Sequence, residues 1–177
     1  YLQSVGFNAM DIGTLMAIIM GTKIISPNIW GWIADHTGKR MAIVRLGCIG
    51  GMLAFVGVFF NDSFWWLAIV MVAFSFFWNA TLPQFEATTF TYLGDQVHRY
   101  SSIRLWGSVG FIVSVWGLGK VLEGDGIGLL PIILLVLFAG IWISSLVVPE
   151  KAAGHLSLDQ EPLRKVISRP EVAGLLV

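Results

Sequence analysis

Three ionisable side chains fall within, or at the edge of, long apolar stretches of the sequence: Lys23, Glu86 and Arg104. A charged side chain at the centre of a membrane helix costs about 2.5–3.5 kcal/mol on the insertion scale, so such residues normally face a cavity or one another. A carboxylate and a guanidinium can form a charge-assisted, bidentate pair, and either group can also bind a polar ligand. These three residues are therefore the first candidates for a binding site.

The apolar stretches around them are long enough to cross a membrane. Hydrophobic residues make up 56% of the 177 residues, charged residues make up 12%, and the mean hydropathy is +0.78. Soluble proteins carry about 25% charged residues. A spanning helix needs about 20 mostly apolar residues, and barrel strands would alternate, which these stretches do not. The sequence therefore predicts an all-α integral membrane protein with five spans: Ile12–Ile33, Met41–Phe60, Phe64–Tyr92, Leu105–Leu122 and Gly128–Val148.

Basic residues indicate the orientation of these spans. Nine of the eleven lysines and arginines follow the first, third and fifth spans, whereas acidic residues such as Asp11 and Asp62 flank the opposite ends. Loops rich in Lys and Arg lie on the cytoplasmic side. This places Tyr1 outside, and we expect one further span before it. The formal net charge is zero, so no nucleic-acid partner is expected.

The most polar long stretch follows the fifth span. We predict a membrane bundle over residues 1–148, a cytoplasmic connector over 149–170 and the start of the next span at 171–177. Within the connector, Pro162–Ile167 fits either a short helix on the membrane surface or a plain solvated linker.

Glu86 and Arg104 are expected to lie at the same depth in the membrane. Asp95 is midway between them, at the centre of the loop that joins the third and fourth spans, so an antiparallel hairpin brings the two residues level. Asn79 shares a turn-spaced stripe with Glu86, and a polar residue at mid-membrane is expected to face a cavity. We predict that Glu86, Arg104 and Asn79 bind polar groups of a substrate. A purely structural ion pair is the alternative.

Lys23 lies near the middle of the first span and is open to two interpretations. A lysine that faces a cavity suits an anionic substrate such as a carboxylate. Alternatively, its side chain extends to the membrane surface, or it pairs structurally with Glu86.

Glycines recur in the second and fourth spans. Small residues let helix backbones approach closely in membranes. We therefore predict helix contacts rather than ligand sites at these positions: Gly47, Gly50, Gly51, Gly57, Gly107, Gly110 and Gly117.

The residues from Gly31 to Arg40 join the first two spans and read Gly-Trp-Ile-Ala-Asp-His-Thr-Gly-Lys-Arg. They resemble the signature loop of the major facilitator superfamily, Gly-x-x-x-Asp-x-x-Gly-x-Arg with a second base, which joins the second and third helices there. Gly31 permits close helix approach, Asp35 can meet a helix N-terminus, and Gly38 supplies a turn that other residues resist. Lys39 and Arg40 are expected to anchor the loop at the anionic inner leaflet. The resemblance implies that this loop gates the cytoplasmic side.

The stretch Phe7–Gly13, followed by the first span and the signature loop, is similar to lactose-permease-like proton symporters, which include oligosaccharide symporters and related phenylpropionate permeases. The likeness covers about residues 1–148. It implies that the spans are helices two to six of twelve, with the start of the seventh, in the N-terminal half. It also implies that Glu86 and Arg104 lie in the sugar site, with Phe111 as the aromatic residue beside them. The usual tryptophan is phenylalanine here, which counts against a galactoside.

The resemblance implies secondary active transport of a small polar solute, a sugar or an organic acid, by alternating access. It implies proton coupling, a monomer when full length, and a location in the plasma (bacterial inner) membrane, so the expected partners are substrate, proton and lipid bilayer. A proton-coupled drug exporter and a non-transporting sensor or scaffold remain alternatives. The three histidines lack metal-ligand spacing, and no nucleophile elbow or phosphate-binding loop is present. No enzyme activity, metal or cofactor is therefore expected.

Overall fold

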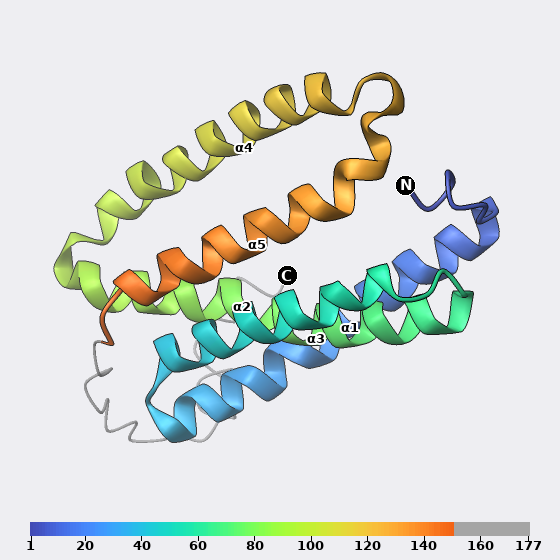
Figure 1. Cartoon of the computed structure of the whole chain (residues 1–177). Coiled ribbons are helices and arrows are strands. Elements are labelled where there is room, and N and C mark those ends of the chain that lie inside the picture. Colours follow the sequence, from blue (N-terminus) through green and yellow to red (C-terminus); the bar gives the residue numbers. More distant parts are fainter. Residues whose placement is uncertain (151–177) are drawn as a thin grey trace, which may run out of the picture.

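The computed structural model describes residues 1–150, apart from the side chains of residues 124 and 125, and in this part of the chain the regular structure is helical (Figure 1). Five α-helices follow one another, with short 3₁₀ segments between some of them. In chain order they are α1 Ala9–Thr37, α2 Arg40–Val56, η1 Gly57–Phe59, α3 Phe64–Leu93, η2 Gly94–Arg99, α4 Tyr100–Leu122, η3 Gly124–Leu129 and α5 Leu130–Val147.

The helices have the length and composition of membrane spans. Within residues 1–150, four continuous helical stretches are long and apolar enough to cross a membrane, and the third, Phe64–Leu122, contains α3, η2 and α4. Figure 1 shows that the chain turns back between α3 and α4, so this stretch supplies two helices of 30 and 23 residues. Each exceeds the length of about 20 residues needed to cross the hydrocarbon core. The all-α membrane fold expected from the sequence is confirmed.

The helix ends differ most from the predicted spans at the end of α1 and at the start of α4. Helix α1 continues through residues 34–37, beyond the predicted span Ile12–Ile33, and α4 begins at Tyr100 rather than Leu105. Both extensions are polar, and hydropathy does not detect helix that continues beyond the apolar core. The turn after α1 is therefore shorter than the predicted loop Gly31–Arg40.

Local capping explains where α1 begins and ends. The Asn8 side chain accepts a hydrogen bond from the Asp11 backbone N–H at 2.8 Å, and so satisfies one of the free amides of the first turn. Gly38 ends the helix with φ 65°, and its N–H donates to the Ala34 carbonyl at 2.9 Å. A residue with a Cβ is disfavoured in this left-handed conformation. The turn geometry predicted for Gly38 is confirmed.

Helix α3 is the centre of the packed part of the molecule. It packs along both α1 and α2, and α2 in turn packs against α5. The α2–α3 contact is close because of glycine: a Cβ added to Gly47 would lie 2.9 Å from the Phe77 carbonyl oxygen, and one at Gly50 would lie 2.6 Å from the Phe77 ring. The predicted helix contacts at Gly47 and Gly50 are confirmed.

Helix α4 differs from the others because none of its residues is buried against the rest of residues 1–150. It contacts α3 at few positions, and Figure 1 shows it apart from the layer that contains α1, α2 and α3. No atom of the described chain lies within 4 Å of a Cβ built on Gly107, Gly110 or Gly117. The helix contacts expected at these glycines therefore have no partner in the described part of the chain.

Most of the predicted connector lies outside the described residues, which include only Pro149 and Glu150 of the segment 149–170. The alternatives for Pro162–Ile167 and the span expected at 171–177 lie outside them as well. These expectations stay predictions.

Candidate functional site

The structure brings Glu86 of α3 and Arg104 of α4 into direct contact. Arg104 Nη1 donates to Glu86 Oε1, and the two residues form an ion pair across the hairpin. The same guanidinium nitrogen donates to the Tyr100 hydroxyl at 3.0 Å. The side chains of Arg104 and Glu86 keep 59% and 33% of their surface exposed, so both can still be reached by a ligand. The equal depth expected from the sequence is confirmed.

A pocket of about 570 Å³ opens beside this ion pair, between α3 and α4. Ligand sites for small molecules usually measure about 300–1,000 Å³. Gly107 and Phe111, one and two turns along α4 from the arginine, line the same pocket, and Phe111 is 69% exposed. The structure therefore groups Glu86, Arg104 and Phe111 as the resemblance implies, although their role in binding stays a proposal.

Tyr100 is a residue of this site that the sequence interpretation missed. It lies one turn before Arg104 on the same helix face, and its ring stacks on Phe90 with ring centres 4.4 Å apart. This stacking holds the hydroxyl where it accepts from Arg104. The spacing of four residues was visible in the sequence, but Tyr100 fell in a stretch interpreted as loop.

Lys23 and Asn79 lie in a second pocket, of about 580 Å³, between α1 and α3. Leu82 lines both pockets and so lies where they adjoin. The Asn79 side-chain nitrogen is buried and has no hydrogen-bond partner within residues 1–150. The structure places Lys23 and Asn79 in one pocket, and Asn79 lies two helical turns before Glu86 on α3.

The structural pairing of Lys23 with Glu86, left open above, is wrong for this structure. Within residues 1–150 the ion pairs are Arg104–Glu86 and Arg40–Asp35, and Lys23 takes part in neither. The physical reason is the rotation of the helices: Lys23 faces the α1–α3 pocket, whereas Glu86 faces α4.

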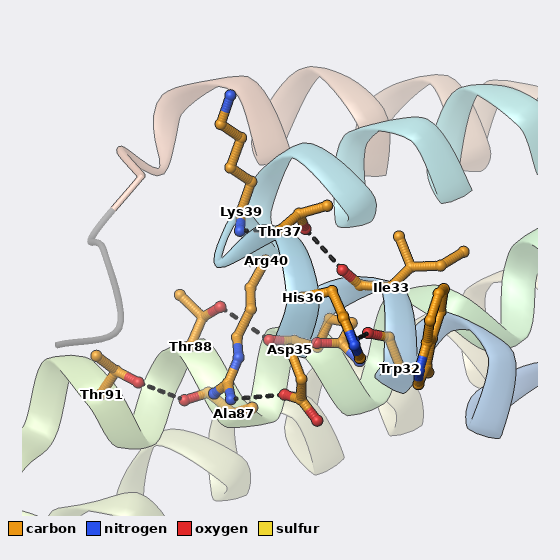
Figure 2. Close-up of polar contacts among 11 residues, drawn as sticks. Trp32, Ile33, Asp35, His36, Thr37, Lys39, Arg40, Ala87, Thr88 and Thr91 are labelled. Carbon is orange, nitrogen blue, oxygen red and sulfur yellow. Dashed lines mark hydrogen bonds and ion pairs between the residues drawn. The ribbon is translucent and has the colours of Figure 1, made fainter. Parts of the chain in front are cut away.

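The signature motif forms a tight turn at the end of α1, and Figure 2 shows its polar contacts. Arg40 Nη2 lies 3.4 Å from Asp35 Oδ1, an ion pair that spans the turn around Gly38. Thr37 Oγ1 donates to the Ile33 carbonyl at 2.7 Å and accepts from the Lys39 N–H at 3.5 Å. These contacts close the turn from both sides.

One expectation for this motif stays a prediction, and another needs correction. Beyond the local backbone of α1, no atom of the described chain lies within 4 Å of a Cβ built on Gly31, so the close helix approach expected there has no partner in residues 1–150. Asp35 does not cap the N-terminus of α2. Because α1 continues to Thr37, the Asp35 carboxylate is carried toward Arg40 instead of the first amides of α2.

Glu150 provides the cap that was assigned to Asp35. Its two carboxylate oxygens accept from the backbone N–H groups of Met41 and Ala42, each at 3.0 Å. Free amides and the helix dipole favour an anion at this position. The sequence signal was an acid directly after an apolar span, on the side where bases predominate.

Two further side chains hold the same segment. Arg45 of α2 donates to the carbonyls of Ser145, at 3.3 Å, and Val148, at 2.7 Å. The Tyr92 hydroxyl of α3 donates to the Pro149 carbonyl at 2.8 Å. Together with the Glu150 cap, these contacts form what we call the Glu150 clasp, which ties the C-terminal end of α5 to α2 and α3.

Comparison with known proteins decides the family. The model of the MFS_1 like family matches residues 1–177, the whole chain. The chain belongs to the major facilitator superfamily. This confirms the resemblance drawn from the signature motif, and with the apolar helices it makes the chain part of a multi-pass integral membrane protein.

The curated relatives of this major facilitator chain are transporters. It is 26% identical over 131 residues to the "Probable 3-phenylpropionic acid transporter" of Escherichia coli (strain K12), covering 68% of this chain and 32% of the relative. It is 28% identical over 125 residues to the "Maltose permease" of Geobacillus stearothermophilus, covering 67% and 30%. The chain thus spans about a third of the length of the relatives it matches. No solved structure matches it.

Proposed function

We propose that the full-length protein is a secondary active transporter that moves a small polar solute across the plasma (bacterial inner) membrane by alternating access. The observation that carries this proposal is the Glu86–Arg104 pair, which lies at the wall of a pocket of about 570 Å³ and keeps part of both side chains exposed. In major facilitators the substrate site lies near the bilayer midplane. A pair placed only for structure would gain nothing from facing a pocket of ligand size.

The proposed substrate is a sugar or an organic acid. The names of the relatives refer to 3-phenylpropionic acid and to maltose, one compound from each class. Glu86 and Arg104 would bind hydroxyl groups, because the pair offers both a hydrogen-bond acceptor and several donors. Phe111 would stack on the body of the solute, and Lys23 and Asn79 would contact its other end.

The signature turn is the proposed cytoplasmic gate, made by Gly31, Asp35, Gly38, Lys39 and Arg40. The Arg40–Asp35 pair is 3.4 Å long, and the Asp35 side chain is 70% exposed. An exposed pair of this kind is worth about 0–1 kcal/mol. It can therefore break and re-form as the two halves of a transporter rock. We further propose that transport is coupled to protons and that the full-length protein is a monomer.

The test is uptake by the full-length protein in proteoliposomes with an imposed pH gradient, using a panel of labelled sugars and organic acids. We expect uptake that collapses when a protonophore removes the gradient. Glu86→Gln and Arg104→Lys should each lower the affinity for the transported solute, while the matched controls Glu123→Gln and Arg99→Lys should not. Unchanged affinity in both site variants would disprove the assigned site, and an absence of any uptake would disprove transport.

A further inference from the structure

Lys23 is a membrane-level cation without a partner in the described structure. Arg104 is paired with Glu86, Arg45 donates to two carbonyls, and Lys120 lies 4.1 Å from the centre of the Trp116 ring. Within residues 1–150, Lys23 makes neither an ion pair nor a hydrogen bond. A charge in an apolar span is unfavourable unless a partner or water compensates it. An anion in the pocket would remove this cost.

Asn79 supplies a second unsatisfied donor in the same pocket. Its Nδ2 atom is buried and has no partner in the described residues. A buried polar group without a hydrogen-bond partner is unfavourable, so a group of this kind calls for a ligand or a water. The neighbouring Ser75 is already satisfied by Thr22, at 2.5 Å. The pocket therefore presents one charged and one neutral donor, and no carboxylate lines it.

Two prolines increase the polarity of the same place. Pro27 of α1 and Pro83 of α3 both line the pocket. A proline has no N–H, so it cannot bond to the carbonyl four residues earlier. Those carbonyls belong to Lys23 and Asn79. Membrane helices tolerate such breaks where water, side chains or neighbouring helices satisfy the freed backbone. The pocket thus combines a lysine, an unpaired amide and two carbonyls that the prolines leave without their usual helix bond. These groups suit a hydrated or liganded cavity and not lipid.

The Glu86–Arg104 pair offers a second place for ligand contact, at a fixed distance from Asn79. Asn79 and Glu86 are seven residues apart on α3, which corresponds to about 10 Å along a helix. The two pockets adjoin at Leu82. Because Arg104 is already neutralised by Glu86, a full negative charge is attracted more strongly to Lys23. The apolar walls beside Lys23 include Phe74 and Trp78, which suit a ring.

We propose that Lys23 and Asn79 form a carboxylate subsite, and that the substrate is a monocarboxylate with an apolar or aromatic body and a hydroxyl group at its far end. The carboxylate binds Lys23 Nζ and Asn79 Nδ2, and the hydroxyl binds the Glu86–Arg104 pair. This inference rests on the proposed transport function and narrows its substrate from sugars and acids to acids.

The experiment measures binding of two matched probes to the purified full-length protein by calorimetry: 4-hydroxyphenylacetate and its neutral counterpart 4-hydroxyphenylacetamide. We expect the wild type to bind the acid at least tenfold more tightly than the amide. Lys23→Gln should remove this preference and leave amide binding within threefold, whereas Lys23→Arg should retain it. The control Lys120→Gln removes a lysine from another helix and should change nothing.

Asn79 gives an independent arm of the same experiment. Asn79→Asp places an anion beside Lys23, so it should abolish acid binding and spare the amide, whereas Asn79→Leu should weaken the acid several-fold. A wild type that binds both probes equally, or neither probe, overturns the carboxylate subsite. So does a Lys23→Gln variant that keeps the preference.

Failure of the two proposals can be told apart. If labelled solutes are taken up and the preference for acids does not depend on Lys23, the carboxylate subsite is overturned. The transport function is then still supported. Binding of the acid with the expected preference, but without uptake in proteoliposomes, supports the subsite and contradicts transport.

Discussion

The two sides of α3 are built in opposite ways. Toward α2, the helix packs without charge, and glycine lets the backbones approach until an added Cβ at Gly47 would lie 2.9 Å from the Phe77 carbonyl. Toward α4, it is joined by the Glu86–Arg104 ion pair and by the stacking of Phe90 on Tyr100, and a pocket of about 570 Å³ lies beside these contacts. The α2–α3 contact serves the fold, and the α3–α4 contact leaves room for a ligand.

In the proposed function, this difference makes α3 a scaffold on one side and a binding surface on the other. Close packing requires small residues, because van der Waals contact is the main force between helices in lipid. A binding surface requires polar groups that are not fully consumed by their neighbours. Changes on the α2 side should therefore affect stability, and changes on the α4 side should affect affinity.

The largest expected effect is on the α4 side. Arg104→Met removes a charged donor, which contributes about 1.5–3 kcal/mol to a hydrogen bond. We expect the affinity for the transported solute to fall about tenfold to a hundredfold, measured as the KM of proteoliposome uptake. The thermal midpoint should change little. A large fall in the midpoint with normal affinity would reverse the assignment of this side.

The next effect is on the α2 side. Gly47→Ala forces a methyl group against the Phe77 carbonyl, and overpacking of this kind costs about 1–3 kcal/mol. Gly51 is the matched control, because it lies one turn along the same face, and its added Cβ would meet its nearest atom at 3.7 Å, an ordinary contact. We expect a lower thermal midpoint in detergent for Gly47→Ala only. Equal midpoints for both variants would show that the two helices are less closely packed than the structure has them.

A smaller effect is expected at the Glu150 clasp. Glu150→Gln removes the charge that caps α2 at the Met41 and Ala42 amides. Loss of a charged cap at a helix N-terminus costs about 0.5–2 kcal/mol. We expect a modest fall in the thermal midpoint of the variant. In the wild type, 1 M salt should also lower the midpoint, because salt screens exposed charges. Identical midpoints at low salt would argue against the clasp.

The smallest effect is expected for Tyr100→Phe. The ring still stacks on Phe90, but the acceptor for Arg104 is lost. A neutral group of this kind contributes about 0.5–1.5 kcal/mol, so we expect a change in KM of about threefold to tenfold. An effect larger than that of Arg104→Met would make Tyr100, and not the arginine, the main contact.

The sequence predicted the helices and the contact between Glu86 and Arg104. Apolar runs define the spans, and the symmetric placement of Glu86 and Arg104 about Asp95 predicts their contact. The sequence could not predict contacts that depend on long-range packing. Glu150 reaches the amide of Met41 from 109 residues away, and no local pattern specifies that pairing.

The sequence also could not predict how each helix is rotated about its own axis. Lys23 was open to pairing with Glu86, and only the packing of α1 against α3 directs it into a different pocket. The end of α1 was misplaced for a related reason: residues 34–37 look like loop by polarity, but Gly38 carries the left-handed cap that ends the helix. Polarity marks where the membrane ends, whereas capping marks where the helix ends.

The central claim, that Glu86 and Arg104 bind substrate and do not merely hold the hairpin together, is tested most directly by exchanging their charges. The double variant Glu86→Arg/Arg104→Glu keeps an ion pair across α3 and α4 but reverses its direction. Uptake in proteoliposomes and the thermal midpoint of the same preparation should be measured together. We predict a midpoint close to that of the wild type with uptake abolished. A double variant that regains uptake lost in both single variants would contradict the account and make the pair structural.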